Sequence, residues 1–291
     1  MNPTEQLIAR AEQLLLRLES LIPAQPAEPD WTTAVAFRWR RRNGAGHLQA
    51  VPHPHRIRPQ DLRGVDEQKK TIDHNTRQFV AGRPANNVLL TGARGTGKSS
   101  LVKAMLHKYA ARGLRLIEVD KHDLLDLPDI VEQLRGRAER FVLFCDDLSF
   151  DAGEPGYKAL KAALDGSIAA PPDNVLIYAT SNRRHLMPEY QEENLGARHV
   201  GTEIHEAEAV EEKVSLSERF GIWLSFYPFD QDAYLAIAEN WLAALGAPVP
   251  DPDAMRRAAL QWALGRGSRS GRTAWQFAKD WAGRARMKDE G

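Results

Sequence analysis

The chain has 291 residues, and its 39 Lys and Arg residues balance its 39 Asp and Glu residues, so the formal net charge is zero. This balance argues against the general basic surface of a nucleic-acid coat protein. Hydrophobic residues make up 43% of the sequence, which predicts a globular protein with one large domain or two modest ones. Cys145 is the only cysteine, which excludes an intramolecular disulfide and a cysteine-based zinc cluster.

The sequence carries no signal for a membrane or for export. No stretch approaches the roughly 18 uncharged apolar residues of a membrane span, and the N-terminus lacks a basic-then-apolar signal pattern. A single cysteine fits a reducing compartment as well. We therefore expect a cytoplasmic protein with no membrane partner.

The first 60 residues are predicted to form a small region that precedes the main domain. Apolar residues at helical spacing indicate an amphipathic helix over residues 3–22, and a Pro- and Ala-rich linker follows over residues 23–29. Apolar alternation over residues 35–39 and turn residues at 43–46 then predict a hairpin that ends near residue 51.

This hairpin carries a run of arginines without an acidic residue among them. Such a run could neutralise the phosphates of a nucleic acid. Phe37 and Trp39 alternate with the arginines and are expected to face the core. A solvated outer face is therefore the favoured interpretation, and nucleic-acid binding is not favoured. The arginines are Arg38, Arg40, Arg41 and Arg42, with Arg56 and Arg58 further on.

A short apolar strand over residues 86–91 runs into a glycine-rich octet and then into a helix. This is the context of a phosphate-binding P-loop, in which backbone N–H groups surround phosphate oxygens and the helix N-terminus adds its positive dipole. Lys98 is expected to reach the β- and γ-phosphates of a nucleotide, and the Ser99 hydroxyl to ligate Mg²⁺. An exposed lysine beside a glycine-rich turn is the alternative. The predicted binding residues are Gly92, Ala93, Arg94, Gly95, Thr96, Gly97, Lys98, Ser99 and Ser100.

Two acidic residues, Asp146 and Asp147, directly follow the apolar strand predicted over residues 141–145. A buried parallel strand that ends in carboxylates places them at the carboxyl edge of the sheet. We expect Asp146 to hold Mg²⁺, mostly through water, and Asp147 to orient or activate the attacking water. The alternative for Asp147 is a cap of the following loop. Cys145 is predicted to be a small buried core residue.

Asn182 is the candidate sensor of the γ-phosphate. It follows the apolar strand predicted over residues 174–179, where its amide could bond the γ-phosphate or the attacking water. Thr180 could take this role instead, or the segment could simply cap the strand. The next residues, Arg183, Arg184 and His185, could face a neighbour's phosphates, and solvated charges are an equally good interpretation.

Arg219 precedes the last predicted strand, residues 222–228, and follows an acidic stretch at 186–214 that is predicted to be a long inserted loop with one short helix. An arginine at this place is typical of the finger that ring ATPases insert into the neighbouring subunit's site. Its permanent charge suits a transferring phosphoryl group. A surface ion pair with a nearby glutamate is the alternative.

Helices are predicted at the end of the chain over residues 230–245, 251–264 and 270–287. The last one begins near Arg272, which could bend back over the nucleotide and report its γ-phosphate, with Arg269 as the fallback. The tryptophans on these helices are predicted to be core residues rather than a base-stacking platform. They are Trp241, Trp262, Trp275 and Trp281.

Taken in order, these motifs resemble an AAA+ ATPase over residues 61–281. The resemblance implies an α/β fold, namely the parallel sheet of a P-loop NTPase flanked by helices, with the P-loop strand central and a C-terminal helical lid. It also implies ATP and Mg²⁺ as ligands and a homo-oligomer whose ATP sites are shared between subunits. More narrowly, the segments Asn86–Leu90, Asp146–Phe150, Ala179–Leu186 and Ser215–Gly221 are similar to the bacterial DUF815 family of predicted AAA+ ATPases.

The resemblance further implies that Arg63, Gly64 and Val65 lie against the adenine through backbone contacts. In such ATPases the second acid after the strand is usually Glu, whose side chain is one methylene longer than that of Asp147. We expect this difference to affect the turnover rate rather than nucleotide binding. We divide the chain accordingly into an N-terminal region (1–60), a nucleotide-binding core (61–229) and a helical lid (230–291).

The leading hypothesis is an oligomeric ATPase that hydrolyses Mg·ATP to drive a conformational change on an unknown protein client. Its predicted catalytic residues are Lys98, Asp147, Asn182 and Arg219. The alternative is a slow ATP-dependent binding switch that acts as a loader or adaptor for a DNA or protein machine. A small-molecule kinase is disfavoured, because the lid and the place of Arg219 suit ring ATPases better.

Overall fold

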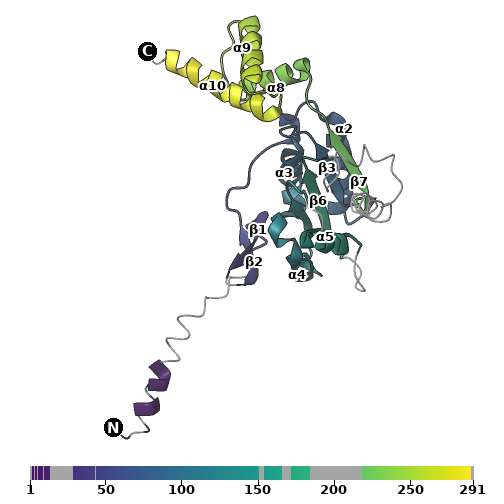
Figure 1. Cartoon of the computed structure of the whole chain (residues 1–291), viewed down its shortest axis with the longest axis vertical. Helices are drawn as coiled ribbons and strands as arrows, with labels where there is room; N and C mark the ends of the chain where they lie inside the picture. The colour runs from purple at the N-terminus through teal and green to yellow at the C-terminus, as the bar shows by residue number, and fades with distance from the viewer. Residues whose placement is uncertain are drawn as a thin grey trace, which may run out of the picture.

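A seven-stranded sheet in the order β2-β1-β4-β5-β6-β3-β7 forms the centre of the computed structural model (Figure 1). Neighbouring strands run parallel except β2, which pairs antiparallel with β1. The structure describes residues 2, 4, 6–8, 10–13, 29–42, 44–150, 154–165, 172–183 and 218–289. The strands are β1 (Ala36–Arg42), β2 (Ala45–Ala50), β3 (Val88–Gly92), β4 (Leu114–Glu118), β5 (Arg140–Cys145), β6 (Val175–Ser181) and β7 (Ile222–Phe226).

Helices cover both faces of this sheet because successive side chains of a buried strand point to opposite faces. In β5, Phe141, Leu143 and Cys145 belong to one hydrophobic cluster, and Val142 and Phe144 belong to the other. The first cluster includes α4 (Leu127–Leu134) and α5 (Pro155–Asp165), and the second includes α2 (Asp66–Val80) and α3 (Lys98–Tyr109). The result is a three-layer α/β fold, as predicted. Short 3₁₀ helices are η1 (Pro59–Asp61), η2 (Ala110–Arg112) and η3 (Lys121–Asp126).

The lid consists of α8 (Gln231–Ala244), α9 (Pro252–Gly265) and α10 (Gly271–Asp289), which share a hydrophobic cluster of their own (Figure 1). Asp230 and Asp251 cap α8 and α9, since their carboxylates accept from the N–H groups of Ala233 at 2.8 Å and Ala254 at 2.9 Å. The buried residues of the lid cluster belong to neither sheet cluster, and Phe229 packs against both the lid cluster and the second sheet cluster. The division between core and lid near residue 230 stays our proposal.

The hairpin of β1 and β2 lies in the core sheet rather than in a separate N-terminal region, because β1 pairs in parallel with β4. Phe37 and Trp39 are buried, as predicted, and the Trp39 indole N–H donates to Asp126 at 2.8 Å. Two arginines of the hairpin, and Arg58 after it, are paired with acids, which favours a solvated face over a phosphate-binding one. These ion pairs are Arg38–Glu118 at 2.7 Å, Arg41–Asp126 at 3.0 Å and Arg58–Asp61 at 3.0 Å.

The structure also corrects the place of the P-loop strand. β3 is not central but lies between β6 and β7, one strand from the edge.

Of the helix predicted over residues 3–22, residues 4, 6–8 and 10–13 are helical. Residues 14–22, Asn43 and the predicted insertion at 186–214 lie outside the described residues. In the described part of the chain, no helix is long and apolar enough to cross a membrane.

Cys145 gives a direct test of the sheet packing. Its side chain is fully buried at the end of β5, and burial raises the pKa of its thiol to about 12. Since the thiolate is the reactive form, the native protein at about pH 8 should leave a chromogenic disulfide reagent unreacted, and one thiol per chain should react after unfolding in guanidinium. Rapid labelling of the native protein would contradict the packing of β5 between the two helical layers.

Candidate functional site

The carboxyl ends of β3, β5 and β6 meet at the edge of the sheet that faces the lid. A cavity of about 750 Å³ lies there, lined by the P-loop, the ends of β5 and β6, the segment before α2, and helices α8 and α10. Open parallel sheets bind ligands at this edge. The cavity brings together predicted residues from separate parts of the sequence, namely Val65, the run Arg94–Ser100, Asp146, Asp147, Thr180, Asn182 and Arg272.

The P-loop is held between β7 and the lid. Gly92 has a φ of 122°, and a Cβ atom there would lie 1.9 Å from the carbonyl oxygen of Phe226. Gly95 has a φ of 75°, and a Cβ atom there would lie 2.8 Å from the Ser270 side chain. The Gly95 carbonyl accepts from the Gly271 N–H at 2.8 Å. Only glycine allows both approaches, so the loop and the first turn of α10 are in direct contact.

Lys98 places a buried positive charge beside the cavity. Its side chain is only 5% exposed, and its ammonium donates to the carbonyls of Gly92 at 2.7 Å and Ala93 at 2.8 Å. A third bond goes to Asn182 Oδ1 at 3.1 Å. All three acceptors are neutral, and burial lowers the pKa of Lys98 although Asp147 and Asp146 lie near enough to oppose the shift. The site is therefore complementary to an anion.

Asp146 is oriented by two hydroxyl groups. Its Oδ1 accepts from Ser99 Oγ at 2.7 Å and from Thr180 Oγ1 at 2.6 Å. The Thr180 hydroxyl oxygen also accepts from the Asp147 N–H at 2.9 Å. Thr180, which the sequence offered as an alternative sensor, thus fixes the two acids that follow β5.

Asn182 connects Lys98 to Asp147. Its Oδ1 accepts from the Lys98 ammonium, and its Nδ2 donates to Asp147 Oδ1. Asp147 has a φ of 53°, the one left-handed φ outside glycine in the part of the chain that the structure describes. Aspartate adopts this conformation more readily than most residues. Because of this left-handed backbone conformation, the two adjacent carboxylates accept hydrogen bonds from different partners. Asp146 accepts from Ser99, and Asp147 accepts from Asn182.

The lid contributes aromatic side chains that sequence reasoning assigned to its core. Trp241 of α8 and Trp275 of α10 both line the cavity, and their ring centroids are 4.7 Å apart. One feature of the sequence could have predicted that Trp275 lines the cavity. Arg272 and Trp275 are three residues apart on a helix, so a lid that turns Arg272 toward the nucleotide also turns Trp275 there.

The segment before α2 joins the core to the lid. Val65 is buried and lines the cavity, while Gly64 packs against Phe229, whose ring a Cβ atom at Gly64 would approach to 2.9 Å. The Arg63 Nε donates to Asn240 Oδ1 of α8 at 3.1 Å. The contact of Gly64 and Val65 with adenine stays a prediction. Arg184 and His185 lie outside the described residues.

Arg219 lies away from this cavity. It precedes β7, whose Ile222 pairs with Val88 at the start of β3, so it stands at the amino edge of the sheet, opposite the P-loop. Its Nε donates to Asp165 Oδ1 at 2.5 Å, at the end of α5. Because the length of β7 separates Arg219 from its own P-loop, the residue cannot act on a nucleotide bound to the same chain.

The residues present fit a nucleotide with a hard divalent cation. The N-terminus of α3 has no side-chain cap, which leaves backbone N–H groups for phosphate oxygens. Ser99 and Asp146 offer the oxygen ligands that Mg²⁺ prefers. Within the described ranges, no group of three His, Cys, Asp or Glu residues could hold a metal alone. Mg²⁺ usually keeps several waters and shares its coordination with substrate phosphates.

The sequence profile of the family described as "Protein of unknown function (DUF815)" matches residues 32–285. The chain belongs to the DUF815 family. The match runs from the hairpin to the last lid helix and includes the P-loop, both acids after β5 and Asn182.

Solved structures define the fold of this DUF815 chain. A variant of RuvB from Thermotoga maritima has a TM-score of 0.53 and 16% identity over 76% of this chain and 63% of its own. The ORC1 protein of Aeropyrum pernix, in complex with DNA, has a TM-score of 0.52 and 17% identity over 74% of this chain and 58% of its own. The FIGL-1 AAA domain, in complex with ADP, has a TM-score of 0.50 and 17% identity over 77% of this chain and 72% of its own.

These likenesses, with the sheet order, establish the AAA+ P-loop NTPase fold with a helical C-terminal region. The DUF815 chain spans less than two thirds of the RuvB chain, of which it covers 63%, and of the ORC1 chain, of which it covers 58%.

The substitution Gly92→Ala tests how closely β7 approaches the P-loop, with Gly113→Ala as the matched control. Both glycines have left-handed φ, 122° and 91°, but a Cβ atom at Gly113 meets nothing within 4 Å. We expect Gly113→Ala to lower the free energy of unfolding by about 1 kcal/mol. Gly92→Ala should lower it by at least about 2 kcal/mol more, because the Phe226 backbone must move. If denaturant unfolding curves gave the two variants equal losses in the free energy of unfolding, the close contact between Gly92 and the Phe226 backbone would be contradicted.

Proposed function

We propose that the chain is an ATPase that binds Mg·ATP between the P-loop and the lid and hydrolyses it by attack of water on the γ-phosphate. The observation that carries this proposal is the joint placement, on one cavity, of the Lys98 ammonium, the Ser99–Asp146 hydrogen bond and the Asp147–Asn182 pair. Phosphoryl transfer needs a cationic group, metal ligands and a group that orients the nucleophile. The AAA domain of FIGL-1, which has the same fold, is in complex with ADP, and this supports a nucleotide as the ligand.

Different parts of the protein would bind different parts of Mg·ATP, namely the P-loop, the metal ligands and the lid. The N–H groups of residues 92–100 and the Lys98 ammonium would hold the phosphates, and Ser99 and Asp146 would hold Mg²⁺, Asp146 mostly through water. When bound, the metal neutralises charge on the β- and γ-phosphates. Gly64 and Val65 would contact the adenine, and Arg272 would contact the γ-phosphate from the lid.

Asp147 and Asn182 would orient the attacking water. As the water oxygen bonds to the γ-phosphorus, the bond to the bridging oxygen breaks, a water proton moves to Asp147, and ADP and inorganic phosphate are formed. Because Asn182 bonds both Lys98 and Asp147, it is placed to couple the position of the water to that of the γ-phosphate. The short aspartate side chain favours slow turnover.

The position of Arg219 at the amino edge supports a role for it in a second copy's site. A head-to-tail contact would bring this edge of one copy to the carboxyl edge of the next. The guanidinium would then stabilise the charge of the transferring phosphoryl group. The proposed active protein is therefore a homo-oligomer that transmits movement between core and lid to a protein client.

A second candidate is a slow ATP-dependent switch that loads or adapts a DNA or protein machine. The ion pair of Arg219 with Asp165 favours it, because a finger held in its own chain leaves the site in a low-turnover state. A small-molecule kinase is supported less well, because a helical lid together with an arginine at the place of Arg219 suits ring ATPases better.

The dependence of steady-state ATPase activity on protein concentration separates a motor from a switch. A motor whose sites are completed by neighbours should show turnover per chain that rises steeply as copies assemble. A switch should stay near ~10⁻³ s⁻¹ or below at every concentration, the rate of an unassisted P-loop NTPase. No hydrolysis together with phosphorylation of an added small-molecule acceptor would contradict both and support a kinase.

Mixing two inactive variants tests the action of Arg219 on a second copy. Arg219→Ala should lower turnover by about 10³-fold or more while leaving ATP affinity nearly unchanged, and Lys98→Ala should abolish binding. In a mixed assembly, the intact Arg219 of the Lys98→Ala copy would face the intact P-loop of its partner. ATPase activity should therefore recover.

The matched control mixes Arg219→Ala with a chain that carries both substitutions, which should stay inactive. Absence of recovery in the first mixture, despite demonstrated co-assembly, would show that Arg219 has a structural role.

A further inference from the structure

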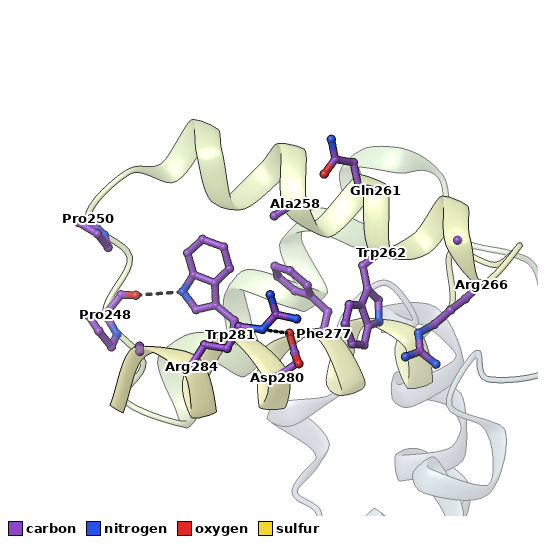
Figure 2. A pocket seen from close by; sticks show the side chains of 12 residues that line it. Pro248, Pro250, Ala258, Gln261, Trp262, Arg266, Phe277, Asp280, Trp281 and Arg284 are labelled. Carbon is purple, nitrogen blue, oxygen red and sulfur yellow. Dashed lines mark hydrogen bonds and ion pairs between the residues drawn. The ribbon is translucent and has the colours of Figure 1, made fainter. Parts of the chain in front are cut away.

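A second cavity lies on the outer side of the lid, and it shares no lining residue with the nucleotide cavity. It has a volume of about 1060 Å³ and lies between α9, α10 and the turn that joins α8 to α9 (Figure 2). Trp262, Phe277 and Trp281 line it as a row of rings, with centroid separations of 6.2 Å for the first pair and 5.7 Å for the second. Pro248 and Pro250 line the end next to Trp281 (Figure 2). We name this cavity the lid groove.

A row of aromatic rings is the usual binding surface for proline in an extended polyproline helix. That helix has three residues per turn and rises about 3.1 Å per residue, so prolines three positions apart lie on one face, roughly 9 Å apart. Each ring separation is shorter than this repeat, and Phe277 is buried, so prolines three positions apart would contact the two outer rings, Trp262 and Trp281. The indole N–H of Trp262 is buried without an acceptor among the described residues. A polyproline helix bonds none of its own carbonyls and can supply one.

Charge distinguishes the two ends of the lid groove. The guanidinium of Arg266 stacks 4.2 Å from the centroid of the Trp262 ring and forms no ion pair with any residue in the described ranges. Arg284, near Trp281, is paired with Asp280 at 2.9 Å. The Trp262 end of the lid groove is thus positively charged. A peptide that binds the groove should place an acidic residue there.

The chain itself contains a segment with this chemistry. Pro23, Pro26 and Pro29 follow one another at intervals of three, the one such run in the sequence. Residues 18–37 include Glu19, Glu28 and Asp30 and contain no Lys or Arg. Asp30 is held locally by Thr32 and Thr33, which leaves Glu28 as the acid between the last two prolines. We propose that the proline segment, residues 23–29, of one copy binds the lid groove of another copy, with Glu28 facing Arg266.

Geometry requires a second copy. Trp31 packs against Phe141, with 5.1 Å between centroids, and its carbonyl accepts from Arg115, so Trp31, which follows the proline segment in the sequence, lies near the amino edge of the sheet. The lid lies beyond the carboxyl edge, where Gly271 bonds to Gly95. β5 alone is about 20 Å long at ~3.3 Å per residue. Pro26 is five residues from Trp31 and can reach about 17 Å at most. The groove of the same chain is therefore out of reach.

The consequence is a head-to-tail connection between copies that does not depend on ATP hydrolysis. One copy supplies the proline segment and the next supplies the groove, so the contact can repeat into a closed ring or a filament.

A peptide with the sequence of residues 18–30 tests this contact on the full-length chain. It contains no tryptophan, so its binding can be followed by the protein's own tryptophan fluorescence. We expect saturable binding that weakens at least about tenfold when alanine replaces all three prolines, and likewise with protein carrying Arg266→Glu or Trp262→Phe. The control Arg257→Glu reverses a charge on the same helix outside the groove and should leave binding unchanged.

A charge exchange in the full chain gives a second readout, measured as self-association by sedimentation. Arg266→Glu and Glu28→Arg should each weaken association, and the chain that carries both should recover it. No saturable binding, equal binding of the alanine peptide, or binding that persists in both groove variants would overturn the proposal. Binding of an unrelated proline-rich peptide in preference to residues 18–30 would also overturn it and would assign the groove to another protein.

Discussion

The buried ammonium of Lys98 is the constraint around which the site is organised. A charge removed from water is costly unless it is compensated, and each direct acceptor of this ammonium is neutral. The acceptors belong to the P-loop and to Asn182, so the Lys98 side chain fixes both the geometry of the loop and the position of Asn182. A bound phosphate would accept directly from this ammonium, which Asp146 and Asp147 stabilise only without a direct bond. The site is therefore built in advance for an anion, at some cost to the stability of the empty protein.

Parallel register determines which residues gather around Lys98 and which cannot. Thr91 lies beside Ser181 and Cys145 beside Ala179, so the residues that follow each strand reach one edge together. The same register places Arg219 at the opposite edge, and Trp31, which follows the proline segment in the sequence, lies near that edge as well. The groups proposed to act on another copy thus share the amino edge, and their proposed targets, the P-loop and the lid groove, belong to the carboxyl side. One head-to-tail arrangement would serve both proposed contacts.

The sequence allowed the central residues of the candidate site to be predicted because their signals are local. Lys98, Asp146 and Asn182 each follow an apolar strand, and parallel strands end at a common edge. Pairing of β1 with β4 is not local, so the hairpin could not be placed in the sheet from its own alternation. The left-handed φ of Asp147 and the bonds of Thr180 depend on how β5 and β6 lie beside each other. Trp275 lines the cavity because the lid docks on Gly95, and its spacing from Arg272 predicts this place only when Arg272 is already assumed to face the nucleotide.

Calorimetric titration of Mg·ATP tests whether Lys98 and its surroundings form a nucleotide site. The wild-type chain should bind, and Lys98→Ala should show no measurable binding because the charge that faces the phosphates is gone. Lys108→Ala is the matched control, since Lys108 lies on the same helix but pairs with Asp73 away from the cavity, and it should bind as the wild type does. Micromolar affinity retained in Lys98→Ala would contradict the account.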